Sequence, residues 1–233
     1  MTRALAVTTT VLVIFTVVVL TGGTTGIDDW ALNHVMPGVR YGSGSGIVTI
    51  VGLWRPFPLD ALWWGKVLDA YLYPASFFIS MLIVLIACAV MARRGRRVAA
   101  VLWLGAWLGA NALELFGKVA LERPGVTWID AGRPSHLSSF DNSYPSGHVA
   151  RGLVVAAVVS YVYPRLGLVV AAWVVLVPAA LVVAGDHTVS DVVGGALVGL
   201  LLVLGVQVII RGIQLQSSAD DSIERATRSG TTA

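Results

Sequence analysis

Charge is scarce in this sequence. Only 12% of the 233 residues are Asp, Glu, Lys or Arg, whereas a soluble domain carries about 25%. The mean hydropathy is +0.80, and the apolar residues gather in several long runs. A chain of this composition is suited to a lipid bilayer and not to water. The length gives room for one membrane domain and excludes a second globular one.

Cysteine and lysine are almost absent as well. The single cysteine, Cys88, excludes an intrachain disulfide and a Cys-based metal site. Because it lies in an apolar run, we interpret it as a helix-packing residue. Only Lys66 and Lys118 stand beside 14 arginines, and the net charge is +3. That charge is too small to suggest a nucleic-acid surface, so we expect no nucleic-acid partner.

Six apolar runs approach or reach the roughly 20 residues that a membrane-spanning helix needs. They cover approximately residues 4–22, 73–92, 98–117, 148–163, 167–184 and 190–210. The pattern predicts an all-α, polytopic six-helix bundle over residues 1–215. The polar tail 216–233 is expected to be disordered. The first run is too long for a signal-peptide core and lacks a cleavage motif, so we expect a retained helix.

An aromatic stretch follows the first run at residues 60–72. It contains Trp63, Trp64 and Tyr71 beside charged residues, a mixture that favours the headgroup zone of a membrane. We predict a short interfacial helix there, lining the path of a lipid. A plain aromatic anchor is the alternative.

Arginine placement predicts the orientation. With the N-terminus inside, the inner side holds Arg3, the cluster at 93–97, Arg165 and Arg211. Because cytoplasmic segments are enriched in Lys and Arg, both termini are expected in the cytoplasm. We therefore expect a multi-pass protein of the plasma membrane. The sequence leaves the oligomeric state open.

Three polar clusters adjoin the predicted helices, all on the extracytoplasmic side. They are Lys118 with Arg123-Pro124, then Pro145-Ser146-Gly147-His148, then His187 with Asp191. Such co-location of basic, hydroxyl and imidazole groups predicts one reactive site at this end of the bundle.

The second cluster has the features of an anion site. Ser146 and Gly147 precede a helix, whose backbone N–H groups and dipole attract negative charge. His148 is placed to donate a proton to a departing oxygen. The alternative is an ordinary helix cap, since serine is a common N-cap.

The third cluster suits a histidine nucleophile. His187 and Asp191 are four residues apart and share one helical face. A carboxylate beside the ring would fix the tautomer of a histidine that attacks phosphorus. A hydrogen-bonded polar pair is the alternative. With neither a Cys nor a third ligand nearby, we expect no metal and no cofactor.

Lys118 and Arg123 supply positive charge for phosphate oxygens. The alternative is a pair of anchors that reach the headgroups.

These three clusters, in this order, resemble the signature of the type 2 phosphatidic acid phosphatase (PAP2) superfamily. The resemblance implies a metal-independent reaction through a phosphohistidine. His187 would be the nucleophile, Asp191 would orient it and His148 would protonate the leaving group. Ser146, Gly147, Lys118 and Arg123 would hold the phosphate.

The sequence departs from the family pattern in its cations. Gly125 stands where the second Arg of a doubled Arg-Pro motif is usual, and Ala180 and Leu181 replace a Ser-Arg pair. Arg151, three residues after His148, is our candidate replacement for phosphate binding; pairing with Glu114 is the alternative. Arg133 is a second candidate.

The expected function is hydrolysis of a polyprenyl (di)phosphate or a glycerolipid phosphate in the membrane. Residues 185–191 also resemble lipid head-group transferases related to sphingomyelin synthases, which would pass the group to a hydroxyl acceptor. A degenerate, lipid-binding member without activity is the second alternative.

Overall fold

The computed structural model describes residues 1–34, 67, 70–121, 144–183 and 187–230. Throughout these residues the regular structure is helical. The elements are α1 (Thr2–Leu20), α2 (Thr25–His34), η1 (Tyr73–Ala75), α4 (Phe77–Arg93), α5 (Arg97–Ala120), α6 (Gly147–Val162), η2 (Pro164–Leu166), α7 (Gly167–Val183) and α8 (Val189–Gly230).

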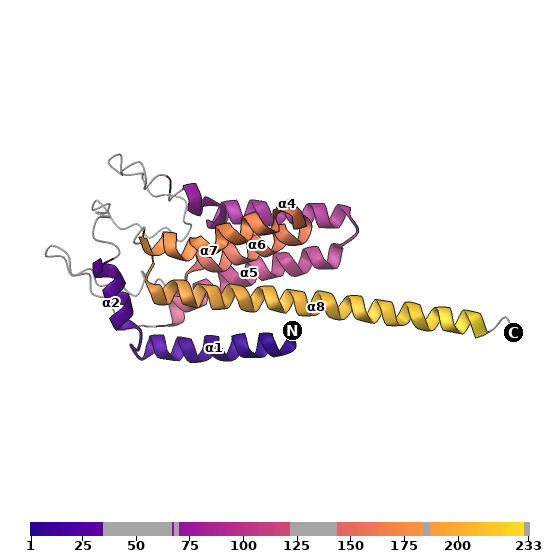
Figure 1. Ribbon diagram of the computed structural model, residues 1–233, viewed down its shortest axis with the longest axis horizontal. Helices are drawn as coiled ribbons and strands as arrows, with labels where there is room; N and C mark the ends of the chain where they lie inside the picture. Colours follow the sequence, from indigo (N-terminus) through magenta and orange to yellow (C-terminus); the bar gives the residue numbers. More distant parts are fainter. Residues whose placement is uncertain (35–66, 68–69, 122–143, 184–186, 231–233) are drawn as a thin grey trace.

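The long helices form a bundle (Figure 1), in which α6 packs against α4, α5, α7 and α8, and α1 packs along α8. The predicted all-α, polytopic class is confirmed. Four helical stretches are long and apolar enough to cross a membrane: Thr2–Leu20, Arg97–Ala120, Pro164–Val183 and Val189–Ala219. Helices α4 and α6 are apolar but have only 17 and 16 residues. By length alone, two of the six predicted spans, α4 and α6, are therefore shorter than a membrane-spanning helix usually is.

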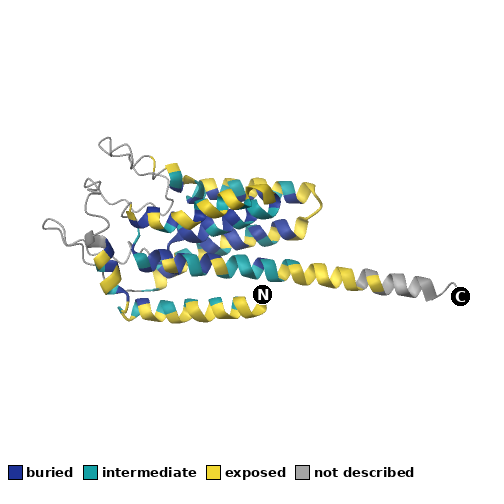
Figure 2. Cartoon of the chain, in the orientation of Figure 1, coloured by how far each residue is buried: buried dark blue, intermediate teal, exposed yellow. Residues whose placement is uncertain are grey.

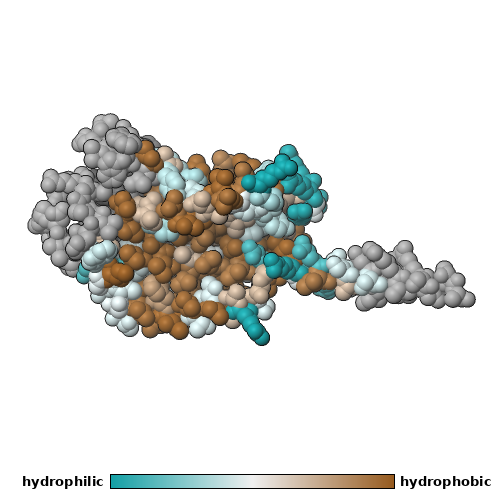
Figure 3. All heavy atoms as spheres, viewed as in Figure 1, coloured by the Kyte–Doolittle hydropathy of each residue, from teal (hydrophilic) through white to brown (hydrophobic). Residues whose placement is uncertain are grey.

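The bundle is apolar inside and outside. Its inward faces are buried (Figure 2), with Trp103, Val84 and Val154 among the fully enclosed side chains. Outward-facing side chains are also apolar; Val101 and Leu168 are 70% and 83% exposed. Figure 3 shows hydrophobic residues over much of the visible face of the bundle. A surface of this kind is stable in lipid and costly in water.

Arginines collect at the end of the bundle where α4 turns into α5, which is hydrophilic in Figure 3. Arg94 donates a hydrogen bond of 3.0 Å to the Val162 carbonyl oxygen and lies over the Tyr163 ring, 5.5 Å from its centroid. A cation stabilises the negative end of a helix dipole. The contact thus fixes the C-terminus of α6 against this turn.

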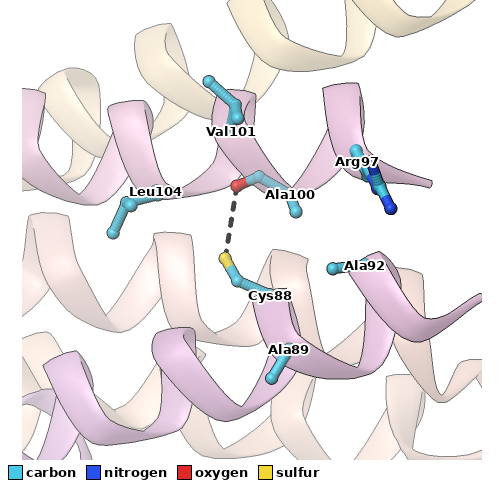
Figure 4. A pocket seen from close by; sticks show the side chains of 7 residues that line it. All are labelled: Cys88, Ala89, Ala92, Arg97, Ala100, Val101 and Leu104. Carbon is cyan, nitrogen blue, oxygen red and sulfur yellow. Dashed lines mark hydrogen bonds between the residues drawn. The ribbon is translucent and has the colours of Figure 1, made fainter. Parts of the chain in front are cut away.

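Cys88 lies in a small pocket between α4 and α5 near the same end of the bundle (Figure 4). Its Sγ donates to the Ala100 carbonyl oxygen at 3.2 Å, and Ala89 and Ala92 line the same space. Small side chains allow two helices to approach closely. These contacts agree with the interpretation of Cys88 as a packing residue.

Glycines bring the starts of α6 and α8 together. A Cβ atom on Gly195 would lie 2.3 Å from the Ser146 carbonyl oxygen, and one on Gly199 would lie 3.1 Å from the Ala150 carbonyl oxygen. Gly194 faces the buried Tyr144 ring in the same way. The hydroxyl of Tyr144 shares a 2.8 Å hydrogen bond with Thr16 of α1. The end of the bundle with the predicted site thus depends on glycine contacts along α8.

Valine at position 195 should separate α6 from α8, because no backbone atom beside it can move cheaply. We expect Gly195→Val to cost about 1–3 kcal/mol of stability, as overpacking usually does, and to lower the melting temperature in detergent. Gly205→Val is the matched control, since nothing lies within 4 Å of a Cβ at that position of the same helix. Equal melting temperatures for the two variants would contradict the predicted contact.

The structure differs from the prediction at both ends of the chain. A short helix, α2, directly follows α1, and the sequence did not predict it. The short interfacial helix that we predicted lies at residues 60–72. That stretch lies largely outside the described residues, although Val67 and residues 70–72 are helical. Helix α8 runs without a break to Gly230, through most of the tail expected to be disordered. Its polar residues include good helix formers and no proline, so the helix propagates.

Candidate active site

Residues 144–148 lead into α6 and form its first turn. Ser146 is its N-cap and Gly147 its first residue. The Ser146 N–H donates to the Asp191 carbonyl oxygen at 2.9 Å, which ties the starts of α6 and α8 together. The Ser146 hydroxyl is fully buried and has no hydrogen-bond partner within the described residues. A buried hydroxyl with spare bonding capacity, beside helix N–H groups, can bind an anion.

A capping box shapes the start of α8. The Thr188 N–H donates to Asp191 Oδ2 at 2.9 Å, and the Asp191 N–H reaches Thr188 Oγ1 at 3.4 Å. This is the reciprocal arrangement of a Thr-x-x-Asp capping box. The pattern is visible in the sequence, but the prediction rested on the His187–Asp191 spacing alone. The capping box is what holds the carboxylate of Asp191 in place.

His187 lies directly before this capping box. Its Nδ1 is 3.5 Å from Asp191 Oδ2, a polar contact slightly too long for a good hydrogen bond. In the described residues this buried nitrogen has no other hydrogen-bond partner. The side chains of His187 and Asp191 are 9% and 0% exposed. A buried carboxylate on this side of the ring leaves Nε2 as the nitrogen available to a substrate.

The two predicted catalytic histidines are neighbours. The ring centroids of His148 and His187 are 6.3 Å apart, and the ring planes make an angle of 62°. His148 comes from α6 and His187 from the residues before α8. The close packing of α6 on α8 therefore brings two imidazoles to within reach of one small group.

Arg151 pairs with Glu114, which is the alternative that the sequence left open. Its NH1 contacts Glu114 Oε2 and donates to Asn111 Oδ1 at 3.1 Å. Its Nε donates to the Ala75 carbonyl oxygen at 3.1 Å. Only 5% of Arg151 is exposed. The Arg151 guanidinium thus has three protein partners. Binding of a phosphate by Arg151 stays a prediction.

Glu114 joins three of the predicted phosphate ligands. Its Oε1 lies 2.6 Å from Lys118 Nζ and its Oε2 contacts Arg151. A Cβ on Gly147 would lie 1.8 Å from Oε2, so the carboxylate rests against the first residue of α6. Position 147 has no room for a side chain. An anion thus already lies beside a helix N-terminus and two cations.

Several predicted residues cannot be placed. Arg123, Arg133 and Gly125 lie outside the described residues. Ala180 and Leu181, which replace the family's Ser-Arg pair, are buried in α7 among apolar neighbours. Among the described residues, no three His, Cys, Asp or Glu side chains gather in a way that would hold a metal ion.

Comparison with known proteins identifies a family to which this part of the chain is similar. Residues 102–213 match the PAP2 superfamily. The resemblance predicted from the three polar clusters is thereby confirmed. The PAP2 match includes every one of the predicted site residues, from Lys118 to Asp191.

One solved structure is similar over nearly the whole chain. It is a transmembrane PAP2 type phosphatidylglycerolphosphate phosphatase from Bacillus subtilis, with a TM-score of 0.63 and 21% sequence identity. The similarity covers 90% of this chain and 96% of the other. The two proteins share a fold. No curated protein matches this chain.

Proposed function

We propose that this protein is an integral membrane phosphatase that hydrolyses a lipid phosphate. The observation that carries the proposal is the pair of neighbouring imidazoles, His148 and His187, with Asp191 beside the latter. The PAP2 match over the same residues supports phosphoryl chemistry. A polyprenyl (di)phosphate or a glycerolipid phosphate is the proposed substrate, because both present a phosphate at the depth of the headgroups.

The proposed reaction has two steps. Nε2 of His187 attacks phosphorus, a P–N bond forms, and the P–O bond to the leaving group breaks. His148 gives its proton to the departing oxygen. His148 then takes a proton from water, which attacks the phosphohistidine and releases phosphate. Asp191 stabilises the positive charge on His187 during the first step. No metal or cofactor takes part in the proposal.

The phosphate oxygens need donors and positive charge. Ser146 and Gly147 supply these at the start of α6, with Lys118, Arg123 and Arg151 as the proposed cations. Phosphoryl transfer depends mainly on positioning and on such charge stabilisation. Lys118, whose side chain is 34% exposed, is the more accessible of the two described cations.

The proposed setting is the plasma membrane, with both termini in the cytoplasm and the histidines on the extracytoplasmic side. The arginine-rich end formed by the α4–α5 turn supports this orientation, because positive charge is retained on the cytoplasmic side. The lipid partner would reach the site from the bilayer.

A phosphate-release assay on the purified protein tests the proposal. We expect release from at least one lipid in a panel of prenyl phosphates, prenyl diphosphates, phosphatidic acid and phosphatidylglycerolphosphate, with no loss in EDTA. Loss in EDTA would contradict the metal-free mechanism. Release only when a hydroxyl acceptor is added would favour a head-group transferase. No release from any lipid would favour a lipid-binding member without activity.

A further inference from the structure

Asp28 is a buried carboxylate that neither the sequence motifs nor the proposed mechanism uses. It lies in α2 and is 1% exposed. Its Oδ1 accepts the Ser190 N–H at 2.8 Å, and its Oδ2 accepts the Ser190 hydroxyl at 2.6 Å. The two residues are 162 positions apart in the chain. Both carboxylate oxygens of Asp28 thus accept hydrogen bonds from Ser190, the residue before Asp191.

The two hydrogen bonds complete the cap of α8. A helix leaves its first N–H groups without partners inside the helix. Thr188 Oγ1 accepts the N–H of Asp191, the third residue of α8. Asp28 accepts the N–H of Ser190, the second residue. Asp28 therefore does from another helix what an N-cap does locally, and its negative charge suits the positive end of the α8 dipole.

A continuous chain of hydrogen bonds leads from Asp28 to the site. The Ser190 and Thr188 hydroxyls are 3.1 Å apart, and Thr188 exchanges the two capping-box bonds with Asp191. Asp191 then contacts His187 Nδ1. The loss of Asp28 would remove the acceptor of the Ser190 N–H. Because these groups are buried, water could not easily replace that acceptor. The first turn of α8 would shift to find another.

We infer that Asp28 is a positioning residue, which holds the first turn of α8 so that Asp191 and His187 meet in the reactive geometry. The inference rests on the proposed function, in which His187 is the nucleophile. Asp28 does not touch the substrate; it acts through Ser190 and Thr188. Helix α2 is consequently part of the active site's support, although it lies far from the PAP2 match in the sequence.

The test compares Asp28→Ala with Asp28→Asn. Asparagine retains an oxygen for the Ser190 N–H, whereas alanine retains none. We expect kcat of Asp28→Ala to fall about 10–100-fold, as it does on loss of comparable supporting groups, with KM changed less than threefold. Asp28→Asn should recover most of this loss. Ser190→Ala combined with Asp28→Ala should lose less than the product of the single losses, because one interaction is removed twice.

Ile27→Ala is the matched control, since its side chain is the exposed neighbour of Asp28 in the same helix. It should leave kcat unchanged. If Asp28→Ala retained the kcat of the wild type per folded molecule, the inference would be wrong, whatever its melting temperature. If Asp28→Asn lost as much as Asp28→Ala, hydrogen-bond positioning would also be wrong.

Wild type and His187→Ala, measured in the same assay, separate the inference from the proposed function. An inactive wild type would refute the function; an active wild type with an unaffected Asp28→Ala would refute only the inference. A second readout needs no activity. With four histidines in the chain, ¹⁵N-histidine spectra should show the His187 ring signals shifted in Asp28→Ala and restored in Asp28→Asn. Unchanged His187 signals in Asp28→Ala would overturn the inference.

Discussion

Replacement of His187 by alanine is expected to reduce phosphate release by at least about 10⁴-fold, the loss typical of removing a nucleophile from a catalytic group that acts as a unit. A buried carboxylate oxygen of Asp191 lies 3.5 Å from Nδ1 of the His187 imidazole. His148 cannot take over the attack, because in the proposal it provides the proton. The measurement is the initial rate of phosphate release from the best lipid substrate in detergent micelles.

The same variant should remain folded. The His187 side chain is enclosed, but its Nδ1 makes no hydrogen bond to a described residue other than the long contact to Asp191. We expect a melting temperature within a few degrees of wild type. Unimpaired phosphate release by folded His187→Ala would remove the phosphohistidine from the mechanism.

Replacement of Arg151 by alanine is expected to have the largest effect on stability. Removal of one partner from a buried ion pair costs about 3–5 kcal/mol, because the other charge stays buried without compensation. Among the described residues, Glu114 would then retain Lys118 as its one cation, while Asn111 Oδ1 and the Ala75 carbonyl oxygen would lose the hydrogen bonds from Arg151. The measurement is the melting temperature of purified Arg151→Ala in detergent.

A double variant separates charge pairing from phosphate binding. If Arg151 serves only to neutralise Glu114, then Arg151→Met with Glu114→Gln removes both charges and should recover most of the stability and the KM of wild type. If Arg151 also binds phosphate, the double variant should be stable but retain a raised KM. Lys118→Met is the control for loss of a cation at the more exposed position. A fully stable Arg151→Ala would contradict the ion pair itself.

The helices were predictable because a bilayer allows few structures. A chain that crosses lipid must satisfy its backbone hydrogen bonds within each segment, so a long apolar run becomes a helix. Helix α6 begins at Gly147, one residue before the predicted limit. The end of α8 was not predictable in this way. Beyond residue 210 the apolar pattern stops, but helix propensity continues.

Helix α2 and its contact with Ser190 could not be predicted from the sequence. The helix has ten residues and is not markedly apolar, so it gives no membrane signal. A hydrogen bond between residues 162 positions apart leaves no trace in a local pattern. The Thr188-x-x-Asp191 capping box, in contrast, was visible in the sequence, and it gives Asp191 a structural role besides the catalytic role that we propose.

The sequence led to one expectation about the position of the two histidines and left the partner of Arg151 open. The order of motifs led us to expect His148 and His187 at one end of the bundle, and their rings lie 6.3 Å apart. Arg151 had two possible partners in the sequence, and the structure shows it with Glu114. Burial decides such a choice, since an arginine without a partner inside a bundle is costly. Burial depends on packing, which spacing alone does not give.

Helix α8 extends well beyond the bundle. Its 42 residues extend about 63 Å at 1.5 Å per residue, roughly twice the thickness of the hydrocarbon core. The half beyond the bundle projects away from the end of the bundle at which α8 begins (Figure 1). In the orientation that we propose, a fluorescent reporter joined to the C-terminal end of α8 would stand tens of ångströms from the bilayer, and its quenching would report that orientation.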